Sequence, residues 1–492
     1  MPLPSRDPAD LTVVGKGAPA HLPTLRDRAL DVLLDPTLAH VVDLVCWLEK
    51  GLVHVADSFG HVALGPDGTA CILAGRDPVA DQDPFSDATS AYPYAAVRLH
   101  SLFADPRAPD LAVVHTGAHM WPERGGHPGE HGSLNGVQSR APLLLSGPGV
   151  AARGLLDEVC RAVDVGATLA HLAGATQDDM DGAPLAQVVP AATHVVGLLW
   201  DGAQCADLLD RTAAGDLPNV ARLLARGCAF RGGAIAEFPS VTLVNHTCLL
   251  TGAGPGRHGI VHNAFYDRAS GLQIVPNSSA NWHHSMQWLR PEVRTLWERL
   301  PKGTSSACVN EPCDRGAEYS TFALLRARGT TGSDTLASVL PPAADDPHAT
   351  QSFVAASADY AWGTQVDHMG LQQVLDLWRA DAPPRVMWWN TTLTDGGHHA
   401  GGPCSEIARA SVRDTDRRLG VWLDLVEERG LLDETVVLLT ADHGSQGADP
   451  SCTGDWDEAL RAAGVPFRDE AYGFLYLGSD VALTGRGAGS FC

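Results

Sequence analysis

Short apolar runs, each closed by a polar residue or a glycine, recur along this chain and constrain its fold more than any other feature. The five runs are DLAVVHTG (110–117), PLLLSGPG (142–149), HVVGLLWDG (194–202), RVMWWNTTLTDGG (385–397) and ETVVLLTADHG (434–444). Helical patterns accompany them over 164–174, 218–227 and 405–430. Continuous apolar strands that alternate with helices predict an α/β fold, in which helices cover both faces of a mostly parallel sheet.

The composition is that of a chain able to bury a sizeable core, since 45% of its 492 residues are hydrophobic. The 58 acidic against 35 basic side chains give a formal charge of −23, which disfavours nucleic-acid polymers and anionic membranes as partners. The 11 cysteines lack the spacing of a disulfide framework. The start has no apolar signal-peptide core, and no run approaches the ~20 apolar residues of a membrane span. We therefore expect a cytoplasmic protein that does not bind membranes.

Acidic residues and histidines follow three of the predicted strands. Asp201 follows VVGLLW, Asp395 follows VMWWNTTLT, and Asp442 with His443 follows VVLLTA. Asp395 also forms an Asp-x-x-x-His pair with His399. A lone Asp after a strand is as often a helix cap or a turn residue. Three acidic ends that meet at one sheet edge, with two histidines, instead favour a zinc or manganese site.

A second polar segment, FPSVTLVNHTCLLTGAGPGRHGIVHN (238–263), opens with a turn and continues as a predicted helix from Thr242 to Leu250. The free N–H groups at a helix start favour a phosphate or a developing oxyanion beside the hydroxyl. No Ser-His-Asp arrangement accompanies Thr242, so a metal would have to activate it as a nucleophile. On these residues alone, a helix N-cap is the stronger interpretation of Thr242.

Four segments resemble, in this order, motifs of the alkaline phosphatase superfamily, and most of all its nucleotide pyrophosphatase/phosphodiesterase branch. They are DGAQCADLL, the 238–263 segment, TDGGHHAGGPCSE and TADHGS. The resemblance implies an alkaline-phosphatase-like fold with Thr242 as nucleophile and Asn263 as the phosphate-binding residue. It also implies two divalent metal ions, zinc or alternatively manganese. One ion would be held by Asp201, Thr242, Asp442 and His443, and the other by Asp395 and His399.

The family's last metal ligand is missing from its usual place, because no histidine follows His443. The segment GEHGSLNGVQSRAPLLLSGPGV (129–150) resembles the closing part of the same fold and places that role on His131. The rival histidines are His115, His119 and His127 near His131, and His398 beside His399.

This motif order predicts a circular permutation. Residues 1–190 would correspond to the C-terminal part of the fold and 193–492 to its N-terminal part, and together they would form one catalytic domain. Chain termini that lie close together in surface loops make such a rearrangement tolerable. Residues 264–384 lack strong strand signals and would form a cap or insertion over the site.

The resemblance implies a hydrolase of phosphodiester or phosphoanhydride substrates of nucleotide type, acting through a phospho-threonine intermediate on Thr242. The substrate would be a small anionic phosphoester. Cleavage of the C–P bond of a phosphonate such as phosphonoacetate is the alternative within the enzyme class. A metal-binding paralogue without turnover is the alternative of another class, which the presence of all seven candidate ligands disfavours.

Overall fold

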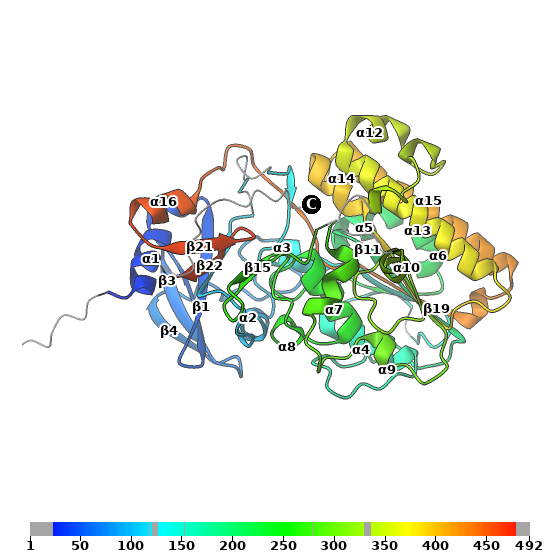
Figure 1. Ribbon diagram of the computed structural model, residues 1–492, viewed down its shortest axis with the longest axis horizontal. Helices are drawn as coiled ribbons and strands as arrows, with labels where there is room; N and C mark the ends of the chain where they lie inside the picture. Colours follow the sequence, from blue (N-terminus) through cyan, green and yellow to red (C-terminus); the bar gives the residue numbers. More distant parts are fainter. Residues whose placement is uncertain are drawn as a thin grey trace, which may run out of the picture.

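The computed structural model describes residues 23–478, apart from 118, 121–125, 152, 279 and 329–335. Its largest element is an eight-stranded sheet in the right half of Figure 1. In spatial order the strands are β17 (Tyr319–Ser320), β16 (Ser306–Val309), β18 (Val386–Thr391), β11 (His194–Trp200), β19 (Thr435–Thr440), β8 (Leu143–Ser146), β12 (Gly227–Phe230) and β9 (Gly154–Leu156). All neighbours pair in parallel except at β8, which runs antiparallel to both β19 and β12.

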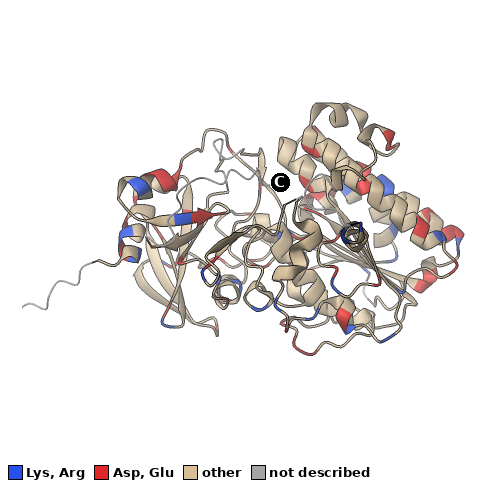
Figure 2. Ribbon diagram, in the orientation of Figure 1, with Lys and Arg blue, Asp and Glu red and all other residues tan. Residues whose placement is uncertain are grey.

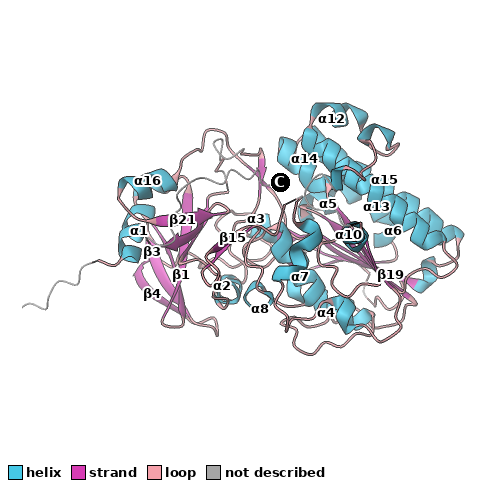
Figure 3. Cartoon of the chain, viewed as in Figure 1, coloured by secondary structure: helices cyan, strands magenta, loops and turns pink. Residues whose placement is uncertain are grey.

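Helices cover both faces of this sheet, which confirms the predicted α/β fold (Figure 3). Alternate side chains of the central strands enter two hydrophobic cores. One core holds α4 (Ala162–Leu172) and α7 (Thr242–Thr251). The other holds α13 (Ala358–Arg379) and α15 (Glu406–Glu428). No strand of the sheet carries Asp, Glu, Lys or Arg (Figure 2), and every strand except the edge strands β17 and β9 is buried on both faces.

A second sheet of seven strands occupies the left half of Figure 1. Each of its strands pairs antiparallel with its neighbours. In spatial order it contains β21 (Phe467–Glu470), β22 (Phe474–Leu477), β5 (Leu111–His115), β1 (Val42–Glu49), β2 (Leu52–Asp57), β3 (Gly60–Leu64) and β4 (Ala70–Gly75). Helices α1 (Leu25–Leu33) and α16 (Trp456–Ala462) pack on one face, and α2 (Ala95–Phe103) packs on the other. Segments from the two ends of the described chain therefore share one sheet.

Shorter elements connect these layers. The helices are α3 (Gly136–Ser139), α5 (Cys205–Ala214), α6 (Pro218–Leu224), α8 (Pro255–His258), α9 (Leu296–Arg299), α10 (Thr321–Ala327), α12 (Gln351–Ala356) and α14 (Leu393–Gly401), with 3-10 turns at Pro36–Leu38, Trp282–Trp288, Ala343–Asp345 and Leu432–Glu434. The strands are β6 (Gly129–Glu130), β7 (Arg140–Ala141), β10 (Cys160–Arg161), β13 (Ala234–Ile235), β14 (Phe265–Asp267), β15 (Leu272–Ile274) and β20 (Gln446–Gly447).

The structure differs from the expected arrangement in two respects. Residues 264–384 are not a separate insertion throughout, because β16, β17 and α13 belong to the central sheet and to its covering layer. The strand β16, Ser306–Val309, is not among the predicted runs because its residues, SACV, are less apolar than the LLLS of the equally short β8. The predicted strand 110–117 exists as β5, but it lies in the antiparallel second sheet. An apolar run indicates that both faces of a strand are buried, but it does not indicate the direction of the strand.

Candidate metal centre

The polar residues that follow the central strands lie together at one edge of the sheet. Asp201 follows β11, while Asp442 and His443 come two and three residues after Thr440, the last residue of β19. Asp395 lies in the first turn of α14, directly after β18. Asp201, Asp395 and His443 each offer one ligand atom, and these atoms lie within 4.8 Å of one another. The convergence expected from parallel strands is therefore present.

Gly202 makes this approach possible. Its φ of +67° favours glycine, and a Cβ placed there would lie 2.6 Å from Oδ1 of Asp395. The backbone N–H of Gly202 also donates to Oδ1 of Asp442 at 3.0 Å. The glycine after Asp201 thus brings the ends of three strands into one cluster.

His131 completes a second group with Asp395 and His399, again with ligand atoms within 4.8 Å of one another. Nε2 of His399 lies 3.1 Å from Oδ2 of Asp395, one helical turn away. The ring of His131 stacks on that of His443 at 3.8 Å and 16°, and its Nδ1 lies 3.2 Å from the carbonyl oxygen of Ser240. A residue from the first part of the chain is therefore in the same cluster as residues that come 264 to 312 positions later.

The rival histidines are placed differently. The His127 ring lies 4.1 Å from that of His399, edge to face, yet His127 is in none of the ligand groups of the described residues. His115 and His119 lie against backbone carbonyls of Thr116 and Gly454. His398 is buried on α14 and is also outside these groups.

Thr242 is the first residue of α7. The N-cap of this helix is Val241, whose side chain makes no capping hydrogen bond. The N-cap interpretation of Thr242 is therefore wrong. Its Oγ1 lies 3.5 Å from Nε2 of His443, at the edge of the cluster. Oδ1 of Asn263 accepts the backbone N–H of Leu243 at 3.0 Å, which places this amide beside the start of the helix.

Sequence reasoning missed two residues of the centre, His246 and Glu311. His246 forms a third ligand group with Asp201 and Asp442, and its Nδ1 lies 2.9 Å from Oε2 of the buried Glu311. The four-residue spacing from Thr242 places His246 on the same face of α7 and could have marked it. Nothing local to Glu311 in the sequence marks it.

The buried carboxylates and histidines of the cluster shift one another's pKa values. Burial and, after it, the nearby Asp442 carboxylate raise the pKa of Asp201 to about 8. Burial also opposes ionisation of Asp442, but His443 and His246 outweigh it and hold the pKa of Asp442 well below its usual range. Burial lowers the pKa of His443, but Asp442 outweighs it and raises the value to about 9. The carboxylates therefore favour the charged form of His443 and His246, whereas burial lowers the pKa of His131 well below its usual range.

Several buried side-chain atoms of the cluster that could ligate a metal have no hydrogen-bond partner. They are Oδ1 of Asp201, Oδ1 of Asp395, Oδ2 of Asp442, Nδ1 of His399 and Nε2 of His246. An unpaired buried polar atom is costly unless a ligand satisfies it. A mixed set of imidazole nitrogens and carboxylate oxygens is the set that zinc and manganese bind, so the residues present fit a divalent metal.

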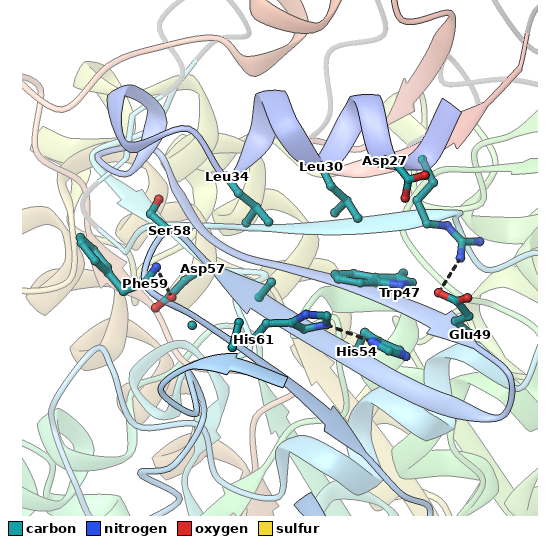
Figure 4. Close-up of a pocket in the computed structure, with 14 residues that line it drawn as sticks. Asp27, Leu30, Leu34, Trp47, Glu49, His54, Asp57, Ser58, Phe59 and His61 are labelled. Atoms are coloured by element: carbon teal, nitrogen blue, oxygen red, sulfur yellow. Dashed lines mark hydrogen bonds and ion pairs between the residues drawn. The ribbon is translucent and has the colours of Figure 1, made fainter. Parts of the chain in front are cut away.

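A cavity of about 550 Å³ lies elsewhere, between α1 and the strands β1–β4 of the second sheet (Figure 4). Trp47, His54 and His61 line it, with Nδ1 of His54 3.0 Å from Nε2 of His61. None of its lining residues belongs to the metal centre. The cavity therefore lies apart from the candidate metal centre.

The family model described as type I phosphodiesterase/nucleotide pyrophosphatase matches residues 195–485. The chain belongs to this family. The matched range includes every candidate site residue except His131. The family is metal-dependent, in agreement with the donor set of this member.

Two curated relatives of this phosphodiesterase-family chain are similar over part of their length. Ectonucleotide pyrophosphatase/phosphodiesterase family member 3 of Mus musculus is 24% identical over 236 residues, which cover 46% of this chain and 22% of the relative. Alkaline phosphatase PafA of Elizabethkingia meningoseptica is 24% identical over 216 residues, or 44% and 38% of the two chains. The chain thus spans well under half the length of these relatives.

Solved structures similar to this family member include murine ectonucleotide pyrophosphatase/phosphodiesterase 5, as an inactive variant with AMP, at 17% identity and a TM-score of 0.33. Phosphonoacetate hydrolase from Sinorhizobium meliloti 1021 with phosphonoformate is similar at 21% identity and a TM-score of 0.34. Each similarity covers 51% of this chain and 57% of the other. Among the described residues, no helix is both long and apolar enough to cross a membrane.

Proposed function

We propose that this chain hydrolyses phosphodiester or phosphoanhydride bonds of small, nucleotide-type substrates, with Thr242 as nucleophile. The observation that carries the proposal is the Thr242 hydroxyl at the start of α7, 3.5 Å from Nε2 of His443 and at the edge of the cluster. Two divalent metal ions would share seven ligands. One ion would bind Asp201, Thr242, Asp442 and His443, and the other would bind Asp395, His399 and His131.

Zinc is the first choice for both ions and manganese the second, because the ligands mix carboxylates with imidazoles. When bound, the ions supply positive charge that activates the threonine hydroxyl and stabilises the leaving oxygen. The three aspartate ligands nearly balance two divalent ions and leave a net positive site. That local charge would attract an anionic phosphoester to a chain whose formal charge is −23.

Thr242 performs the covalent step. Its hydroxyl gives up a proton to solvent, Oγ1 bonds to phosphorus in line with the leaving oxygen, and the leaving oxygen departs with the electron pair of the broken P–O bond and takes up a proton from solvent. A water molecule then attacks the phospho-threonine, the bond from phosphorus to Oγ1 breaks, and Thr242 regains a proton. Asn263 would donate its amide N–H₂ to a non-bridging oxygen, since its Oδ1 is engaged by Leu243.

We also propose the circular permutation. It is supported by the family match starting at residue 195, while His131, outside that match, lies with Asp395 and His399. The test is a rearranged variant that begins at Thr193, in which a flexible linker connects residue 492 to residue 1 and the chain ends at Pro190. This variant should fold and keep metal-dependent activity. The join lies outside the described residues. A soluble variant of this kind that bound no metal would refute the permutation.

The cytoplasm is the compartment we propose. All ten cysteines among the described residues are unpaired, and seven of them are buried. Buried free thiols are typical of a reducing environment. Fractionation of the source cells with an antibody to this chain would test the location.

The central test compares Thr242→Ala with Thr242→Ser and the wild type. Four substrates separate the candidate reactions: bis-p-nitrophenyl phosphate, p-nitrophenyl phosphate, a dinucleotide and phosphonoacetate, each with and without a chelator. We expect the diester and the dinucleotide to be preferred, and Thr242→Ala to lose at least ~10³-fold of the rate. A loss below tenfold would remove Thr242 as nucleophile. Preference for phosphonoacetate would support C–P cleavage, and metal binding without any turnover would support a non-catalytic paralogue.

A further inference from the structure

A buried histidine–glutamate pair lies directly beneath the metal centre. His246 is 1% exposed and Glu311 is 0% exposed, and Nδ1 of His246 lies 2.9 Å from Oε2 of Glu311. The opposite nitrogen of His246, Nε2, lies 3.6 Å from Oδ2 of Asp201 and 3.5 Å from Oδ2 of Asp442. The imidazole therefore connects a deeper carboxylate to two carboxylates of the cluster.

The two oxygens of Asp201 face different neighbours. Oδ2 faces His246, whereas Oδ1 lies 3.8 Å from Nε2 of His443 and has no hydrogen-bond partner. Asp442 is arranged differently, because its Oδ1 accepts the N–H of Gly202 while its Oδ2 faces Nε2 of His246 at 3.5 Å and Nε2 of His443 at 3.1 Å. His246 and His443 thus face opposite oxygens of Asp201 but the same oxygen of Asp442.

Glu311 is itself fixed on both oxygens. The indole N–H of Trp388 donates to Oε2 at 3.0 Å, and the backbone N–H of Cys313 donates to Oε1 at 2.9 Å. Because Oε2 accepts the Trp388 N–H, Glu311 acts as an acceptor, and Nδ1 of His246 is the donor toward it. This bond sets the plane and the rotation of the imidazole, as carboxylates commonly do for histidines in metal centres.

We propose that His246, fixed by Glu311, is a positioning residue: its Nε2 faces Oδ2 of Asp201 at 3.6 Å, and this contact orients the carboxylate so that Oδ1 points to the metal ion. The inference rests on the proposed function, in which Asp201 is a ligand. It adds two residues to the centre that act through Asp201 and touch no substrate. Direct ligation by His246 is the competing arrangement, and the experiment below separates the two.

The test measures affinity for Zn²⁺ and Co²⁺ by competition with a chelator, together with the thermal unfolding midpoint of each variant. Glu311→Gln keeps the side-chain shape but removes the negative charge and one of the three acceptor contacts. We expect its metal affinity to fall ~10–100-fold. Glu237→Gln is the matched control, because Glu237 is also 0% exposed and pairs with Arg161 at 2.6 Å, outside the cluster. It should shift the unfolding midpoint and leave metal affinity within about twofold.

A double-mutant cycle with His246→Gln tests whether the pair acts as a unit. If it does, Glu311→Gln will cost little further affinity once His246 is replaced. The visible spectrum of the Co²⁺-loaded His246→Gln variant should keep the wild-type ligand-field bands, because no ligand is removed. Loss of a nitrogen ligand in that spectrum would overturn the proposal in favour of direct ligation.

Two other outcomes are separable. Wild-type affinity in Glu311→Gln, in an enzyme whose wild type is active and binds metal, would overturn the positioning role alone. A folded wild type that binds neither ion would overturn the proposed function and the positioning role together.

Discussion

Replacing Gly197 by alanine should strain the layer of the protein beneath the metal centre. Gly197 lies opposite Trp388 in the parallel register of β11 and β18. A Cβ at Gly197 would lie 2.5 Å from Cζ3 of the Trp388 indole and closer still to Cε3, far inside the ~3.5–4.0 Å of a normal carbon contact. Trp388 is 0% exposed, so its ring has no open space into which it can move.

The cost has two parts. Overpacking a well-packed core costs about 1–3 kcal/mol. Displacing the indole also weakens its 3.0 Å hydrogen bond to Glu311, a bond to a charged acceptor that is worth about 1.5–3 kcal/mol. The two effects share one movement and are not fully additive, so we expect Gly197→Ala to lower the free energy of unfolding by about 2–5 kcal/mol.

The assay is urea unfolding followed by tryptophan fluorescence and circular dichroism, with Gly447→Ala as control. A Cβ at Gly447 would meet no atom within 4 Å, and its φ is not positive, so the replacement should change stability by less than about 0.5 kcal/mol. A destabilisation below about 0.5 kcal/mol for Gly197→Ala, with an unchanged dependence of the unfolding free energy on urea concentration, would refute the idea that Trp388 needs a glycine at position 197.

Three further predictions concern single side chains. His131→Ala should reduce bound metal from about two ions per chain to about one, measured by elemental analysis after dialysis, and an unchanged ratio would remove His131 from the centre. Asn263→Asp keeps the acceptor for the Leu243 N–H but loses the amide donor, so its kcat should fall about 10²–10³-fold with an unchanged unfolding midpoint. Burial raises the pKa of Asp43 to about 7 despite the hydrogen bond from Tyr92, so stability should fall as pH rises from about 4 to 7, where only the unfolded carboxyl is ionised. Asp43→Asn should flatten this fall in melting curves, and an identical pH profile would contradict the assignment.

Much of the centre could be predicted because its residues stand in local, ordered motifs. Asp201, Asp442 and His443 follow apolar strands directly, and parallel strands must bring such ends together. His131 needed a different argument, the resemblance of its segment to the closing part of the fold. Glu311 could not be found, because it reaches His246 only through tertiary packing.

The second sheet was beyond sequence reasoning for a physical reason. Its strands β1–β4 are joined by short turns and differ in burial, from the mostly buried β1 and β3 to the fully exposed β4, whereas β21 and β22 join the sheet from the opposite end of the described chain. Pairing between segments so far apart leaves no local signal. Strand direction was equally hidden at β8, since a strand buried on both faces has the same apolar pattern in either orientation.

The position of β8 has a consequence for how the protein can be divided. This strand, Leu143–Ser146, lies inside the central sheet between β19 and β12, both of which come from residues beyond 193. A fragment limited to the family-matched region would lack β8, so the edges of β19 and β12 that β8 joins would be unpaired in the middle of the sheet. Fragments 1–190 and 193–492, produced separately, should be insoluble or unfolded. Mixed during refolding, they should assemble with β8 between those edges, which would make the protein a split system whose metal centre forms only on reunion.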